Sequence, residues 1–585
     1  MVRSNRLLYK KFVQYLLPTM ITYAALSLND FVDTMLVSNL LGSEAMAVIS
    51  LGLPVVLIMS AALQLLGSGG STAYASAIGR RDRDAAGKSI TCAVILAFAF
   101  GLVLLLSGFL FIDPISKLLC SNETLLVPFR KYLSVLLLSA PLMVVTMTIL
   151  SFLPAAGYPG LTTAVNVTSN VINICMDYVY IHVFHMGVEG AAWATLTGYI
   201  CAALIMVAAF AAGRMKLYIS KDVKGSFAQI KDVFRYGSTD AINQVGLSVQ
   251  FAVCNRLAMT AAGANAVVAY SLCIQSASVM TIFLGSMAAA SVPMMAILHG
   301  QRDFHGEAGI LKTTMAGIFA ISVLGTSLFI IFTAPIASLY NIKEPEQLKL
   351  AVTALRIYSL LYIPRYLIII FYNYLKVIGL NRYSSILSAL DSFAAIIPVA
   401  WLLTSIKGIN GLWIAFPLTA SMLIVVILIC NMKYASRSGG RLIWPLLLEN
   451  DVEAKPVLDV TIEKNSKEVT EISEKLYNIC EEMGMDRRTK YRAALAVEEI
   501  AVNAAARKDQ STYVDVLVRI YDGHIVIDFR SLGKPYDPIA EDDTTMMENV
   551  AILRSVAKNI ENEYLMGMNS TRITLEGQSD QKTNI

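Results

Sequence analysis

Long apolar segments separated by short polar ones fill the chain up to about residue 435. Charged residues are absent from 91–112, 132–176, 190–213, 257–298 and 313–342. A helix of about 20 apolar residues is long enough to cross a bilayer. The pattern therefore predicts twelve transmembrane helices, at about residues 12–38, 47–73, 89–112, 131–154, 161–184, 189–213, 237–261, 266–298, 309–333, 351–376, 382–405 and 409–431.

Lysine and arginine are concentrated in every second loop of this scheme. With a cytoplasmic N-terminus, the inner segments hold 21 of these residues and the outer loops hold 6. Because basic residues favour the cytoplasmic side, the distribution predicts that both termini are cytoplasmic. We expect a multi-pass protein of the cell membrane.

The second half of the apolar region repeats the first at an offset of 221 residues. Six helices return a chain to its starting side, so both halves have the same orientation in the membrane. The fold class that follows is an all-α membrane protein with two six-helix bundles, 1–213 and 236–435, joined by a cytoplasmic loop, 214–235. The matching segments are GSEAMAVISL (42–51) with GANAVVAYSL (263–272), GRRD (79–82) with GQRD (300–303), and GVEGAAWA (187–194) with GINGLWIA (408–415).

Composition excludes several classes of protein. Hydrophobic residues make up 56% of the chain and charged residues 15%, against about 25% charged in soluble domains. The net charge of +4 is too small to indicate a nucleic-acid partner. The eight cysteines show neither metal-ligand spacing nor a disulfide framework. Two bundles with a cleft between them suit alternating access of a small molecule.

The order of several motifs over residues 8–432 resembles the multidrug and toxic-compound extrusion (MATE) family of secondary transporters. Two features depart from that family: FLPAAGYPG (152–160) lacks the usual arginine and acidic residue, and Thr239 replaces a proline. The resemblance implies a transporter, not an enzyme, without a tightly bound cofactor. The motifs are DTMLVSNLLGSEAMAV (33–48), GSGGSTAYASAIGRRDRDAAGK (67–88), NICMDYVYI (173–181) and MGVEGAAWAT (186–195).

Four polar residues of the first half lack polar counterparts in the second. A buried carboxylate is costly in a membrane unless it binds a proton or a cation, and Na+ favours oxygen ligands. In one branch of the family these positions form a cation site, which here predicts a site for Na+ or H+. The alternative is a set of interhelical hydrogen bonds that only hold the bundle together. The positions and their counterparts are Asp33 and Cys254, Asn173 and Ala394, Asp177 and Pro398, and Thr195 and Phe416.

Other charges in the predicted spans have open interpretations. Asp30 either shares the cation site with Asp33 or bonds to a neighbouring helix. Arg365 and Asp391 could form an ion pair with a structural role, and a substrate-facing role is the alternative. Arg256 and Lys376 are long enough to extend to a membrane interface.

Composition changes after about residue 441. A linker (436–455) leads into a domain (456–577) for which we predict strands at 457–463, 511–520, 523–530, 562–567 and 570–576. Helices are expected at 466–483, 487–506 and 547–558. This is a small cytoplasmic α+β domain, large enough for its own core.

Two motifs in this domain, AVEEIAVNAA (496–505) and SLGKPYDP (531–538), resemble the histidine-kinase-like ATPases, specifically the anti-sigma-factor kinases. The resemblance implies Glu499 as a base, Asn503 as the Mg2+ ligand and Gly533 beside the nucleotide. Ser531 replaces the aspartate that reads adenine, and the lid region 546–554 has no glycine. We therefore expect a regulatory or partner-binding module, with Mg-ATP binding as the alternative.

The leading functional hypothesis is a secondary antiporter that exports organic cationic or amphipathic small molecules in exchange for Na+ or H+. Its partners would be the substrate, the lipid bilayer and possible regulatory proteins at the C-terminal domain. One alternative is a flippase for lipid-linked precursors, which a large basic cavity would favour. Another is a membrane sensor that signals through the C-terminal domain.

Overall fold

The computed structural model describes residues 6–120, 123–339, 345–450, 455–463, 466–506, 513–521, 523–537 and 547–576. Most of these residues are helical, and a small sheet lies near the C-terminus. The chain divides into two compact units. One contains residues 14–301 and 310–430, and the other contains residues 1–13, 302–309 and 431–585.

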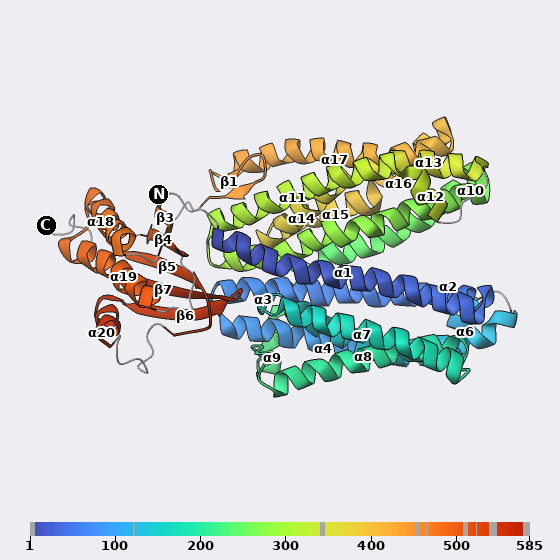
Figure 1. The fold of residues 1–585 in the computed structure, drawn as a ribbon, viewed down its shortest axis with the longest axis horizontal. Coiled ribbons are helices and arrows are strands. Elements are labelled where there is room, and N and C mark those ends of the chain that lie inside the picture. The colour runs from blue at the N-terminus through green and yellow to red at the C-terminus, as the bar shows by residue number, and fades with distance from the viewer. Residues whose placement is uncertain are drawn as a thin grey trace. The chain divides into compact units, whose positions relative to one another are not determined.

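The helices of the first half lie together in Figure 1, in blue to teal, and those of the second half lie together in green to orange. The first half contains α1 (Arg6–Leu41), α2 (Ser43–Leu63), η1 (Gln64–Ser68), α3 (Gly69–Gly79), α4 (Arg83–Leu110), α5 (Ile112–Leu119), α6 (Glu123–Phe152), α7 (Pro159–Tyr178), η2 (Val179–Val183) and α8 (Val188–Ala211).

The second half begins with the short α9 (Val223–Ser226) and η3 (Phe227–Gln229). The long α10 (Ile230–Gly300) is two helices in sequence, because Ala262 and Gly263 have non-helical backbone angles. The remaining elements are α11 (Phe304–Ile331), α12 (Thr333–Leu339), α13 (Pro345–Ser359), α14 (Tyr362–Val377), α15 (Asn381–Ala389), η4 (Leu390–Ala394), α16 (Ile396–Lys407) and α17 (Ile409–Arg437).

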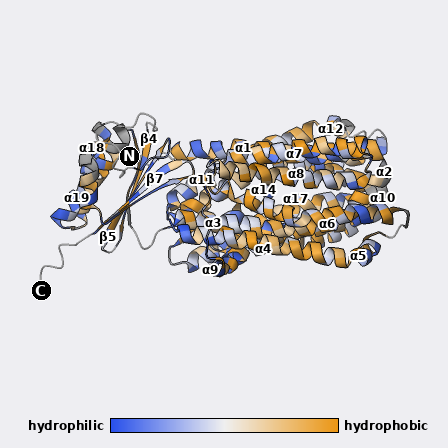
Figure 2. Cartoon of the chain, turned by 90° about the horizontal axis from the view of Figure 1, so that it is seen from below, coloured by the Kyte–Doolittle hydropathy of each residue, from blue (hydrophilic) through white to orange (hydrophobic). Residues whose placement is uncertain are grey.

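Each of the twelve predicted spans falls on helical structure. Within the part of the chain that the structure describes, eight helices are long and apolar enough to cross a membrane, and the bent pair α13–α14 makes a ninth. Figure 2 shows apolar residues, in orange, along most of these helices. Three predicted spans are helical but are not among the helices counted as long and apolar enough to cross a membrane: α1, α7 and the first part of α10. These helices carry the polar residues considered below.

The duplication is visible in the backbone. Positions related by the offset of 221 have positive φ in both copies: Gly42 (83°) and Gly263 (70°), Arg81 (62°) and Arg302 (60°), Gly187 (64°) and Gly408 (62°). Positive φ is uncommon, above all for residues other than glycine. Matched occurrences at three loops therefore indicate the same turn built twice.

The two halves touch at a pair of glycines that are themselves related by the offset. A Cβ added to Gly79 would collide with the backbone of Ile297 and Gly300, and one added to Gly300 would collide with Ser76 and Gly79. Ser76 and Ile297 are also 221 residues apart. The contact is therefore symmetric, and the pseudo-twofold axis that relates the halves passes close to it. Only glycine permits this backbone approach.

The C-terminal domain has a five-stranded antiparallel sheet in the order β3-β4-β5-β7-β6. Helices α18 (Ser466–Glu482), α19 (Arg487–Ala506) and α20 (Met547–Val556) contribute to its apolar core. All five strands and three helices coincide with predicted elements. The short hairpin of β1 (Leu442–Ile443) and β2 (Leu448–Glu449) was not predicted. The strands are β3 (Lys455–Glu463), β4 (Tyr513–Tyr521), β5 (His524–Leu532), β6 (Asn559–Leu565) and β7 (Met568–Glu576).

Alternation of side chains separates two faces of this sheet. Val516, Val518 and Ile527 enter the apolar core with the helices. Their neighbours along the strands, Asp515, Arg519 and Asp528, point to the other face because successive strand residues alternate. That second face is polar yet buried.

Candidate functional site

Two carboxyl groups face each other inside the first six-helix bundle. Asp33 on α1 and Asp177 on α7 lie within hydrogen-bonding reach of one another. Asp177 is fully buried. Neither of its oxygens accepts a hydrogen bond from an N–H or O–H group of any residue that the structure describes. Two facing carboxylates repel in a low-dielectric environment, so the pair needs a shared proton or a bound cation.

Asn173 on α7 and Thr195 on α8 are the other two predicted members of the site. Asn173 is one turn before Asp177 and is buried, and its Nδ2 donates to no described residue. It contacts Gly198 on α8. Because α7 and α8 run antiparallel, Thr195, one turn before Gly198, lies level with Asp177. The Thr195 hydroxyl donates to the carbonyl of Ala191 (3.0 Å) and keeps oxygen lone pairs available.

Asp30 has a different environment from Asp33. Its side chain is exposed, whereas Asp33 is half-buried and Asp177 is fully buried. Asp30 nevertheless lies close enough to Asp33 for the two charges to interact. We call Asp33, Asn173, Asp177 and Thr195 the N-lobe cluster.

A cavity of about 900 Å3 lies between the two halves. Hydroxyl, amide and aromatic side chains from α1, α3, α10 and α14 form much of its lining. The charged residues among the described lining are Asp240, Arg365 and Lys376. No member of the N-lobe cluster lines it, so the cluster and the cavity are separate sites.

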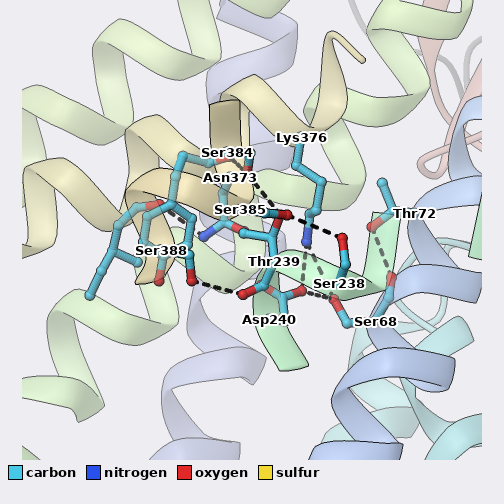
Figure 3. Close-up of polar contacts among 12 residues, drawn as sticks. Ser68, Thr72, Ser238, Thr239, Asp240, Asn373, Lys376, Ser384, Ser385 and Ser388 are labelled. Carbon is cyan, nitrogen blue, oxygen red and sulfur yellow. Dashed lines mark hydrogen bonds and ion pairs between the residues drawn. The ribbon is translucent and has the colours of Figure 1, made fainter. Parts of the chain in front are cut away.

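A lysine, an aspartate and a serine connect the two halves at the cavity wall (Figure 3). The Lys376 Nζ lies 2.7 Å from Oδ2 of Asp240 and 3.4 Å from Oγ of Ser68. The Ser68 hydroxyl donates to the same Asp240 oxygen. Ser68 belongs to the first half, and the other two residues belong to the second. We call these three residues the bridge.

The prediction that Lys376 extends to a membrane interface was wrong. Its side chain is 1% exposed, because Asp240 supplies a carboxylate inside the protein. An ammonium group paired in this way has no need to reach the interface. Arg256, which had the same prediction, is exposed.

Hydroxyl groups fix the segment of α10 that carries Asp240. The Thr239 hydroxyl bonds to those of Ser384 (2.9 Å) and Ser385 (3.2 Å). Ser388 donates to the Thr239 carbonyl (2.8 Å). This network, shown in Figure 3, ties α10 to α15.

The predicted pairing of Arg365 with Asp391 is confirmed. The Arg365 Nε lies 3.8 Å from Oδ2 of Asp391. Asp391 is buried, whereas Arg365 also lines the cavity. The arginine is therefore accessible to a ligand in the cavity, and the buried aspartate is its ion-pair partner on the side away from the cavity.

Sequence reasoning missed Ser68 and Asp240. The signal available for Asp240 was a carboxylate within the predicted span 237–261, together with a lysine in the span 351–376. Ser68 gave no such signal. In the structure it ends the π-helical η1, and Asp391 lies in the π-helical η4. Such turns are rare and frequent at functional sites.

The predicted nucleotide-binding residues are partly described. Glu499 is half-buried on α19, and burial raises the pKa of its carboxyl above the ordinary value, with the charge of Glu498 adding to the effect. Ser531 is fully buried, and Gly533 has a φ of 150°. The Asn503 side chain and residues 538–546 lie outside the described residues.

Known proteins resemble the helical part of the chain. The MatE family model matches residues 18–179 and 241–402, which together are more than half of the chain. The multidrug export protein MepA of Staphylococcus haemolyticus is 23% identical over 407 residues, 69% of this chain and 89% of that protein. The FAD transporter of Shewanella oneidensis is 27% identical over 426 residues, 69% of this chain and 90% of that protein.

Solved structures share the fold of the helical part. An outward-facing multidrug resistance MATE family transporter of the MOP superfamily has a TM-score of 0.68 and 22% identity, covering 73% of this chain and 96% of that chain. A MOP superfamily transporter from Pyrococcus furiosus has a TM-score of 0.67, with the same identity and coverage. The family match, the duplicated helices and the shared fold lead to one conclusion: the chain belongs to the MATE family of membrane transporters.

Proposed function

We propose that the protein is a secondary antiporter that exports amphipathic small molecules in exchange for Na+ or H+. The observation that carries this proposal is the pair of facing carboxyl groups in one half of the bundle, the half-buried Asp33 and the fully buried Asp177. Relatives named as multidrug export proteins support the class of substrate. The predicted topology places the basic loops and both termini in the cytoplasm.

Coupling follows from unequal cation affinity in two conformations. A ligand shifts a conformational equilibrium only when it binds one state more tightly. Asp33 is on α1 and Asp177 is on α7, so relative movement of these helices changes the distance between the carboxyl groups. Binding of a cation between them would favour the arrangement seen here. Release on the other side of the membrane would free the helices to move.

The cavity does not favour the flippase alternative. Its charged lining residues are one aspartate, one arginine and one lysine, and both cations have carboxylate partners. A lipid-linked precursor with several phosphates would need a larger excess of positive charge. Most of the lining is neutral, which suits an amphipathic molecule of modest charge.

Transport in proteoliposomes tests the proposed function. Purified protein would be reconstituted with ethidium or a carboxyfluorescein dye inside, and a Na+ gradient and a pH gradient would be imposed separately. We expect one of the two gradients to drive dye movement against its concentration. Dye movement that responds to neither gradient would contradict antiport.

The C-terminal domain belongs to a compact unit that includes a loop of the helical bundle. Asp303, in the loop between α10 and α11, caps α11 through Oδ1 to the Gly306 N–H (2.9 Å). Its other carboxyl oxygen pairs with Arg530 of β5, and both residues are at most 3% exposed. Arg519 of β4 donates to the carbonyl of Arg302 (3.1 Å). The polar face of the sheet thus holds this loop.

The same unit contains the first turns of α1. The Arg6 guanidinium lies 4.8 Å from the centre of the Tyr513 ring. α1 is part of the first half of the repeat, and the loop at Arg302 and Asp303 is part of the second. Asp82, the repeat counterpart of Asp303, is exposed. The domain therefore contacts segments from both halves, and this supports a regulatory role in restraining their relative movement.

Replacing Arg530 by methionine tests that role. The change removes the buried cation that pairs with Asp303, and breaking a buried pair costs about 3–5 kcal/mol. We expect faster amide hydrogen exchange at residues 302–309 and a transport rate changed by about twofold or more. Arg554→Met, at an exposed arginine of the same domain, is the matched control. Unchanged exchange and transport in Arg530→Met would argue against regulation through this contact.

Nucleotide binding by the C-terminal domain is expected to be weak or absent. Ser531 lacks the carboxylate that would accept a hydrogen bond from adenine, and it is fully buried. Calorimetric titration of the full-length protein with Mg-ATP should give a dissociation constant of about 1 mM or weaker. Micromolar binding that Glu499→Ala abolishes would instead establish an ATP site.

A further inference from the structure

Arg365 is a cation on the cavity wall with unused hydrogen-bonding capacity. It lies on α14, and its side chain is 15% exposed. A guanidinium group has five N–H donors. Its ion-pair partner is Asp391, whose Oδ2 lies 3.8 Å from Nε, a distance longer than a hydrogen bond. Among the residues that the structure describes, no side chain accepts a hydrogen bond from it.

Aromatic side chains surround this arginine. Tyr270, Tyr358 and Tyr366 lie close enough to interact with its charge. The rings of Phe251 and Tyr270 stack at 5.9 Å on the cavity lining. The buried Tyr358 hydroxyl has no hydrogen-bond partner among the described residues. The site combines an arginine that keeps unused N–H donors with the exposed ring of Phe251.

The other two charges of the cavity lining are already used. Lys376 and Asp240 are paired at 2.7 Å, and Ser68 bonds to both. An organic cation that approached Asp240 would have to displace Lys376 and leave its ammonium group buried without a partner. That arrangement is strongly unfavourable. An anion at Arg365 would displace no existing charge pair.

We propose that the cavity selects an aromatic molecule with one anionic group, a carboxylate or a phosphate, and that Arg365 is the residue that binds the anion. Phe251, which is exposed on the cavity lining and stacks on the buried ring of Tyr270, supplies the surface for the aromatic ring. The inference rests on the proposed function, in which this cavity holds the substrate. It replaces the expectation of a cationic substrate with an anionic one.

Flavins provide a matched pair of probes, because riboflavin and FMN share the same ring and differ by one phosphate. The purified full-length protein in lipid nanodiscs would be titrated with each flavin, without any ion gradient, and flavin fluorescence would report binding. A charge-assisted bond to a partly buried arginine predicts that FMN binds about tenfold more tightly than riboflavin. Ethidium, an aromatic cation, should compete poorly with FMN.

Variants of Arg365 test whether this residue causes the preference for FMN over riboflavin. Arg365→Gln should remove the preference for FMN and leave riboflavin affinity unchanged. Because that variant leaves Asp391 buried without its cation, the double variant Arg365→Gln/Asp391→Asn tests the same point without an orphaned charge. Arg356→Gln, at an exposed arginine of α13, should retain the preference.

Equal affinity for the two flavins, or an FMN preference that persists in the double variant, would overturn the proposal. So would ethidium binding more tightly than FMN, or the absence of saturable binding of both FMN and carboxyfluorescein. Because binding is measured without a gradient, a failure of ion coupling would appear only in the transport assay. The two proposals therefore fail separately.

Discussion

Replacing Asp177 by asparagine is expected to abolish ion-driven transport. The substitution keeps the size of the side chain and removes the charge that a proton or Na+ would neutralise. Because Asp177 is fully buried and faces Asp33, a carboxylate at the protein surface cannot take over its role in binding the cation. We expect the transport rate driven by the ion gradient to fall by about tenfold or more. If the two conformations bind the cation equally well, the ion gradient cannot shift the equilibrium between them.

The measurement is dye transport in proteoliposomes, with counterflow under no gradient as a second readout. Counterflow needs only alternating access, so it should persist in Asp177→Asn. Asp33→Asn should behave in the same way. Asp84→Asn, at an exposed surface residue of α4, is the control and should transport normally. Full gradient-driven export by both Asp33→Asn and Asp177→Asn would show that coupling lies elsewhere.

Periodicity and repetition predicted the architecture well, because both are properties of the chain itself. Apolar length determines where a helix can reside in lipid. The offset of 221 residues predicted matched loops, and the positive φ of Arg81 and Arg302 shows the same turn in both. The strands of the C-terminal domain were predicted because alternation of apolar and polar residues has a period of two.

The N-lobe cluster was predicted in part by local rules. Asn173 and Asp177 are four residues apart, and this spacing places them on one face of α7. Their proximity to Asp33 depended on the family resemblance, because helix packing cannot be read from spacing. The facing carboxyl groups of Asp33 and Asp177 are consistent with that expectation.

The bridge could not be predicted because each of its members is ambiguous in sequence. Ser68 is one hydroxyl among many in a polar segment, and Lys376 is long enough to reach an interface. Their roles are set by Asp240, which is 136 residues from Lys376 and 172 from Ser68. Such contacts are decided by how three helices pack, and no pattern of the chain encodes them.

Replacing Lys376 by methionine is expected to destabilise the contact between the two halves. Asp240 would then remain in the cavity wall with Ser68 as its hydrogen-bond donor and without its cation. Breaking a buried pair in this way costs about 3–5 kcal/mol. We expect a lower thermal unfolding temperature and weaker hydrogen-exchange protection of α3, which follows Ser68 directly and contains Gly79. The double variant Lys376→Met/Asp240→Leu should recover most of the stability, since it removes both charges.

Ser68→Ala tests whether the bridge stabilises the contact between the two halves or only the second half itself. This variant leaves the pair of Lys376 and Asp240 intact and removes the hydroxyl that links it to the first half. The expected cost is only about 1 kcal/mol, but exchange protection of α3 should fall, because the bond that is lost joins the two halves. Thr91→Ala, which removes a hydroxyl away from the bridge, should leave α3 unchanged. If α3 stays protected in Ser68→Ala while Lys376→Met unfolds the second half alone, the bridge is a local ion pair and the halves are held by their glycine contacts.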